Sequence, residues 1–174
     1  VDRWKPGKNL VEPVSKNVLD KWMLSRLNEV IREVTTEADA YHTPRMTREL
    51  ALLIDDLSNW FVRRSRRRFW KSEDDGDKQD AYATLHYMLV RTAQLLAPWT
   101  PFIADHLWRD LTKDMNVPTS VHLGDWPEPG KISRKAIDDM AQVREAITIG
   151  LSQRADAKVK VRQPLASVTV PDLP

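Results

Sequence analysis

The fold is decided by residues 43–71, which read TPRMTRELALLIDDLSNWFVRRSRRRFWK. Proline at the second position favours a helix start, because its ring is preorganised for the first helical turn. Apolar side chains then recur at helical spacing, at Met46, Leu50, Leu53, Ile54, Leu57 and Phe61. The stretch therefore predicts one continuous helix, about 40 Å long at roughly 1.5 Å per residue.

Helical patterns also precede and follow this stretch. Residues 18–40 carry an apolar stripe, and further helices are predicted over 78–97, over 100–111 and from Ser133 to Leu151. Val159, Val161 and Leu165, and then Val168 and Val170, alternate as strands do. The sequence therefore predicts a mainly α protein, an antiparallel helix bundle followed by the start of a small C-terminal α+β element.

Four segments are expected along the chain. Residues 1–17 are polar and irregular, as in a linker or the tail of a preceding domain, and residues 18–115 form the bundle. Residues 116–132 are a proline-rich linker that packs back on the bundle. Residues 133–174 hold the fifth helix and the truncated α+β element. A first residue other than methionine suggests a piece of a longer protein.

The composition excludes several kinds of chemistry. The 174 residues carry a net charge of only +2, so any attraction for nucleic acid must be local. The absence of cysteine excludes disulfides and thiolate metal sites, and it fits a reducing cytoplasm. The four histidines are far apart, and no phosphate-binding glycine loop or nucleophile elbow occurs. We expect a cytoplasmic monomer with no membrane span, catalytic residue, metal or cofactor in this chain.

Cations and aromatic rings are concentrated between Asn59 and Lys71. This segment holds six cations and no acid, bracketed by aromatic residues. Guanidinium groups pair with phosphates, and aromatic faces stack on unpaired bases. The segment is therefore typical of a surface that holds a folded RNA, although a solvated basic face remains an alternative interpretation.

Helix geometry divides this cluster. At about 100° per residue from Leu57, Arg64 and Arg68 fall within about 20° of the core line. We predict that both are structural and pair with carboxylates or helix carbonyls of neighbouring segments. The predicted RNA-binding residues are the phosphate ligands Arg63, Arg66 and Arg67, the base contacts Asn59 and Trp70, and the flanking Lys71. A salt bridge from Asp56 is expected to orient the outward arginines.

Several segments resemble isoleucyl-tRNA synthetases, which are class I aminoacyl-tRNA synthetases. They are LDKWMLSRL at Leu19–Leu27, DDLSNWFVRRSRRRFWK at Asp55–Lys71, LLAPWTPFIADHLW at Leu95–Trp108, SVHLGDWPE at Ser120–Glu128 and KVRQPLASVTV at Lys160–Val170. The resemblance implies the anticodon-binding helical domain of such an enzyme. The run SRRRFW favours the isoleucine enzyme over its valyl and leucyl relatives.

The resemblance also implies a parent that attaches isoleucine to its tRNA with ATP and Mg²⁺. The catalytic domain would lie in the same polypeptide, with residues 1–17 as its tail, and this chain alone would bind tRNA without catalysing the reaction. Exposed apolar residues near Trp4 would then be an orphaned docking surface. Two alternatives stay open: the equivalent domain of a valyl- or leucyl-tRNA synthetase, and a helical protein-interaction module with a basic aromatic patch.

Overall fold

A computed structural model describes residues 4–70, 76–167 and 169 of the chain. The chain divides into two compact units, Val1–Ser133 and Arg134–Pro174. The first unit holds α1 (Val18–Asp39), α2 (Thr43–Asp55), the π-helical η1 (Asp56–Val62), α3 (Arg63–Phe69), α4 (Gly76–Leu96), α5 (Pro101–Leu111) and the short 3₁₀ helix η2 (Val121–Leu123). The second unit holds α6 (Arg134–Asp156).

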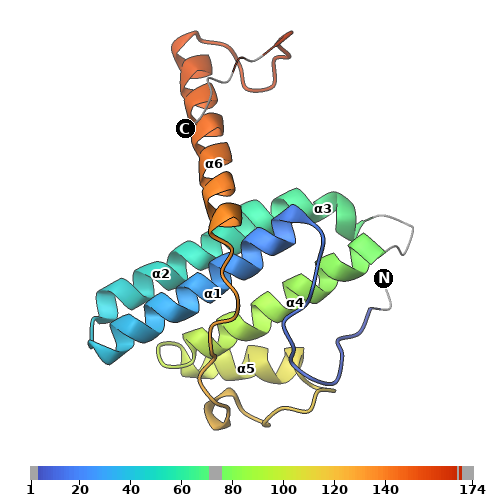
Figure 1. The fold of residues 1–174 in the computed structure, drawn as a ribbon, viewed down its shortest axis with the longest axis vertical. Helices are drawn as coiled ribbons and strands as arrows, with labels where there is room; N and C mark the ends of the chain where they lie inside the picture. The colour runs from blue at the N-terminus through green and yellow to red at the C-terminus, as the bar shows by residue number, and fades with distance from the viewer. Residues whose placement is uncertain (1–3, 71–75, 168, 170–174) are drawn as a thin grey trace. The chain divides into compact units, whose positions relative to one another are not determined.

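The first unit is the predicted antiparallel helix bundle. α2, η1 and α3 follow one another without a break and form the long helix, which runs back along α1 (Figure 1). α4 packs against both α1 and α3, and α5 packs against α4. None of the helices over the described ranges is long and apolar enough to cross a bilayer.

The core of this unit lies between α1, the long helix and α4. α1 buries Met23, Leu27, Val30, Ile31 and Val34 completely, at the helical spacing seen in the sequence. Each such side chain contributes about 1.5–3 kcal/mol when it leaves water. A smaller apolar cluster joins α4 to α5 and η2 through Val90, Ala104, Trp108 and Val121.

The predicted helix phase holds for Leu57 and Phe61, which are buried, and departs from the structure beyond η1, because η1 is π-helical. Hydrogen bonds from residue i to i+5 widen the turn, so each residue rotates less about the axis than in an α-helix. Beyond η1 the buried residues are Ser65, Arg68 and Phe69, whereas Arg64 is exposed. The prediction that Arg64 lies on the core line is therefore wrong.

The segment before α1 packs on the bundle. The Trp4 ring stacks on Tyr82 of α4, with 5.9 Å between ring centroids, and also contacts His86. Leu10 packs against the smaller apolar cluster, and the Lys8 carbonyl accepts a hydrogen bond from the Asn116 amide at 2.6 Å. Trp4 itself is therefore half-buried, whereas Val11, Val14 and Val18 of the same region are exposed. That these exposed residues form a docking surface stays a prediction.

A single asparagine of α1 ties both flanking segments to the bundle. Asn28 is fully buried, and its Nδ2 donates to Glu12 Oε2 at 3.0 Å and to the Lys131 carbonyl at 3.3 Å. Its Oδ1 accepts from the Gly130 amide at 2.9 Å. A β-carbon on Gly130 would meet both the Glu12 carboxylate and the Asn28 amide. The linker after α5 lies against α1 at this point, as it also does where Trp126 Nε1 donates to Thr35 Oγ1 at 2.8 Å.

The second unit differs from its prediction. No residue of α6 is buried, because the described part of this unit brings no second helix against its apolar stripe. Residues 157–167 form turns and irregular backbone, so Val159, Val161 and Leu165 lie in no strand. Val168 and Val170 lie outside the described residues. The structure therefore shows the helix but not the α+β element.

Candidate nucleic-acid interface

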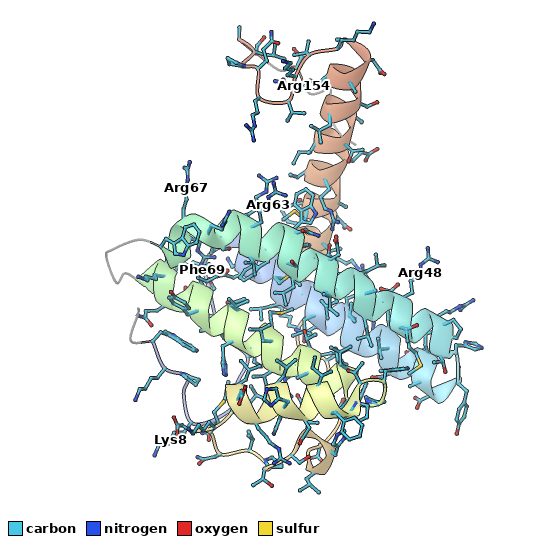
Figure 2. The ribbon with its side chains drawn as sticks, turned by 180° about the vertical axis from the view of Figure 1, so that it is seen from behind. Lys8, Arg48, Arg63, Arg67, Phe69 and Arg154 are labelled. Carbon is cyan, nitrogen blue, oxygen red and sulfur yellow. The ribbon has the colours of Figure 1, made fainter. Side chains whose placement is uncertain are left out.

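Cationic side chains gather on the outer side of the long helix. Arg48, Arg63 and Arg67 are exposed, and Figure 2 shows all three pointing away from the bundle. Over the described part of the chain, none of the three has a hydrogen bond, an ion pair or a ring contact. Arg48 and Arg63 are separated by about 22 Å along the helix at roughly 1.5 Å per residue. These three residues are the outer arginines of this structure.

Most of the predicted RNA-binding residues are exposed on the long helix and at its end. Asn59, Arg63, Arg66, Arg67 and Trp70 are all exposed, and Lys71 lies outside the described residues. The Asn59 amide donates to Asp55 Oδ1 at 2.6 Å, so its orientation is set within the same helix. The structure thus places five of the six predicted residues on accessible surface.

Two of the arginines lie over tryptophan rings. The guanidinium carbon of Arg66 is 4.7 Å from the centroid of Trp70, and that of Arg64 is 5.5 Å from Trp60. Trp70 is 72% exposed, whereas Trp60 is half-buried. An exposed pair of this kind contributes about 0.5–1 kcal/mol. Arg64 therefore covers an aromatic ring and is not held by the carboxylate that the helix count predicted.

Arg68 enters the bundle and makes a bidentate ion pair. Its Nη1 and Nη2 lie 2.7 and 2.8 Å from the two oxygens of Asp20, and Nη2 also lies 2.9 Å from Asp77 Oδ1. Asp20 is completely buried and also accepts from Ser15 Oγ at 2.6 Å. Burial acts to lower the pKa of Arg68, but the hydrogen bonds to Asp20 and Asp77 outweigh it and raise the pKa. This contact joins the end of α3 to the starts of α1 and α4.

A second arginine, the half-buried Arg26, pairs with carboxylates of α1 and the long helix. Arg26 lies 3.0 Å from Glu29, 3.0 Å from Glu49 and 3.3 Å from Asp56. Asp56 is buried and faces α1, so the expectation that it orients the outward arginines is wrong. Burial, with the nearby Glu49 and Glu29 carboxylates, raises the pKa of Glu33 at the edge of this group.

The distribution of charge follows from these contacts. Glu49 and Asp56 of the long helix pair with Arg26, and Asp20 and Asp77 pair with Arg68. Among the described residues, the outer arginines keep no neutralising partner. A chain with a net charge of only +2 therefore presents a locally positive face. Arg48 belongs to this face and escaped the sequence analysis, because it lies outside the arginine cluster. Arg48 lies nine residues before Leu57, and at about 100° per residue this places it opposite the core line. Its outward position could therefore have been predicted from the sequence.

The described residues bring together no three histidine, aspartate or glutamate side chains that could hold a metal ion. Over the described residues, the arrangement is a long helix that carries guanidinium groups without partners and one exposed indole ring. Guanidinium groups suit contacts to phosphates, and an exposed ring suits stacking on unpaired bases.

Comparison with known proteins gives the family. Residues 20–170 match the family described as the anticodon-binding domain of tRNA ligase, and the chain belongs to that family. Similar curated proteins are the isoleucine–tRNA ligases of Streptomyces coelicolor (42% identical over 171 residues), Thermus thermophilus (40% over 168) and Dehalococcoides mccartyi (40% over 174). The matches cover 94–98% of this chain but only 16–17% of each relative.

Proposed function

We propose that this chain is the tRNA-binding part of an isoleucine–tRNA ligase. The family assignment and the names of its relatives support this reading. The parent enzyme would attach isoleucine to its tRNA with ATP and Mg²⁺, and its catalytic domain would lie in the same polypeptide. The reaction would take place in that domain, and this chain by itself would be inactive.

The observation that carries the proposal is the set of outer arginines beside the exposed Trp70. Unpaired guanidinium groups on a rigid helix can contact successive phosphates without first breaking ion pairs within the protein. We propose that Arg63 and Arg67 bind phosphates of the anticodon loop and stem, and that Arg48 extends this contact along the stem. Trp70 and Asn59 would meet the unstacked loop bases, which proteins read by stacking and by hydrogen bonds to base edges.

Arg68 has a different part in the proposal. Its guanidinium is committed to Asp20 and Asp77, so it is not available to RNA. We propose that Arg68 fixes the end of α3, on which Arg67 and Trp70 are carried. Lys71 follows directly in the sequence and is proposed as a further phosphate contact.

Three further proposals concern the parent protein. Residues 1–17 would connect the bundle to the catalytic domain. Residues 133–174 would begin a small α+β element, in which the alternating residues around Val161 pair as strands with chain beyond this piece. The parent would be a cytoplasmic monomer, in keeping with the lack of cysteine and of apolar spans in this sequence.

Fluorescence anisotropy with labelled anticodon stem–loops tests the function. We expect the isoleucine stem–loop to bind more tightly than the valine and leucine ones, and more tightly than isoleucine loops with altered bases. Preference for the valine or leucine stem–loop would identify the equivalent domain of that relative. Equal binding of all loops, altered ones included, would contradict anticodon recognition and favour an acidic protein partner.

A further inference from the structure

Arg66 and Trp70 form a unit at the end of α3. They are separated by one helical turn, and the Trp70 amide donates to the Arg66 carbonyl at 3.2 Å as it closes the helix. The Arg66 guanidinium carbon is 4.7 Å from the centroid of the indole ring. Because Trp70 remains 72% exposed, a second planar group can still reach the ring.

Arg66 differs in this respect from its cationic neighbours. Arg63 and Arg67 have no ring contact or ion pair over the described residues and point into solvent (Figure 2). The guanidinium of Arg66 instead lies over an aromatic ring, so its geometry points first to Trp70. The role of Arg66 as a phosphate ligand stays a prediction, and the experiments below distinguish it from a role in holding the ring.

Trp70 needs such a contact to present a defined surface. It is the residue that caps α3, and its side chain can turn about two bonds. A stacked guanidinium restricts these rotations, and a restricted side chain loses less entropy when a ligand binds. An indole ring held in place is a better platform for a nucleobase than a freely rotating one.

We propose that Arg66 is a positioning residue that holds the Trp70 ring in place for an unpaired nucleobase to stack on it. Arg66 then acts on RNA affinity through Trp70 and makes no phosphate contact of its own. The inference deepens the proposed function and rests on it, because the base belongs to the same RNA.

A double-mutant cycle in RNA binding tests this dependence. With the isoleucine anticodon stem–loop, Trp70→Ala should weaken binding about 5- to 150-fold, the range for loss of one stacked base. Arg66→Ala should weaken binding about 2- to 5-fold in the wild-type background. In the Trp70→Ala background it should have no further effect. Arg67→Ala, the matched control, should have the same effect in both backgrounds.

The salt dependence of binding separates the two roles a second time. The slope of log K against log salt concentration is negative, and loss of one phosphate contact makes it less steep by about 0.7–0.9. Arg67→Ala should show this change, and Arg66→Ala should leave the slope unaltered. Equal losses for Arg66→Ala in both backgrounds, together with a less steep slope, would overturn the positioning role and make Arg66 a phosphate ligand.

A measurement on the free protein keeps the inference testable if the isolated chain binds no RNA. The ¹⁵N heteronuclear NOE of the Trp70 indole Nε1–H, assigned by its absence in Trp70→Phe, reports the mobility of the ring. We expect Arg66→Ala to lower this NOE and Arg67→Ala to leave it unchanged. An unchanged NOE in Arg66→Ala would refute the positioning role. Absence of RNA binding by wild-type protein would instead count against the proposed function.

Discussion

Replacing Arg68 with alanine should destabilise this protein more than replacing any of the outer arginines. The substitution leaves Asp20, which is fully buried, with the Ser15 hydroxyl as its remaining side-chain donor among the described residues. It also removes the contacts that tie α3 to Asp77 at the start of α4. The dominant cost is the uncompensated carboxylate in the core, because its charge has lost both water and its counterion.

The expected magnitude follows from the burial of both partners. Arg68 is only 7% exposed, and two of its nitrogens lie within 2.8 Å of the Asp20 oxygens. Removing one partner of such a pair costs about 3–5 kcal/mol. A chain of this size loses about 2–4 °C in Tm per kcal/mol, so the Tm should fall by roughly 6–20 °C. Arg67→Ala, one residue away and fully solvated, should stay within about 0.5 kcal/mol of wild type.

Thermal and urea unfolding followed by circular dichroism would measure both variants. The double variant Asp20→Asn/Arg68→Ala adds a sharper test, because the amide removes the stranded charge while keeping the shape. It should be more stable than Arg68→Ala alone, with a coupling energy of about 0.5–3 kcal/mol. If Arg68→Ala and Arg67→Ala unfold at the same temperature, or if Asp20→Asn does not relieve the loss, the reasoning is wrong.

Three further predictions concern other parts of the molecule. The raised pKa of Glu33 means that the folded protein holds this proton more tightly than the unfolded chain does. The stabilisation that the protonated Glu33 carboxyl gives the folded state is therefore fully present below about pH 4.3. It is lost as pH rises through the pKa of the folded protein. Glu33→Gln should raise Tm at pH 7 in differential scanning fluorimetry, and a gain that persists undiminished at pH 4 would contradict this assignment. Gly130→Ala should cost about 1–3 kcal/mol in urea unfolding, because the new methyl group would displace the Glu12 carboxylate and the buried Asn28 amide, which hydrogen-bond to each other. The control Gly150→Ala, in open space on a helix, should be neutral or stabilising, so equal losses would argue against the tight contact. Arg48→Ala should weaken RNA binding and make its salt slope less negative by about 1, whereas Lys113→Ala, in the exposed turn after α5, should do neither.

Much of the interface could be predicted from local sequence. The outward positions of Arg63, Arg66 and Arg67 follow from helical spacing, and the structure places them on exposed surface. Arg48 could have been found by the same count. The partners of these side chains could not, because a ring contact such as that between Arg66 and Trp70 depends on which rotamers the surrounding helix end allows.

The α+β element shows where local pattern was insufficient. Alternating valines around Val161 indicate strand propensity, but a strand forms only when its backbone groups pair with another strand. The described residues of the second unit supply none. In the same way, the apolar stripe of α6 predicted a buried face that its own unit does not cover.

The sequence by itself determined the helices, their antiparallel order and the family, because helical periodicity and the quoted segments are local properties of the chain. The helix count correctly placed Arg68 in the core, but only the tertiary structure showed that Arg64 stays outside it. The π-helical turns of η1 rotate the helix so that Ser65 and Arg68 are buried and Arg64 is not. The choice of Asp20 as partner joins residues 48 positions apart, because the fold brings the start of α1 to the end of α3. The spacing of residues along one helix cannot specify which residue of another helix they will contact.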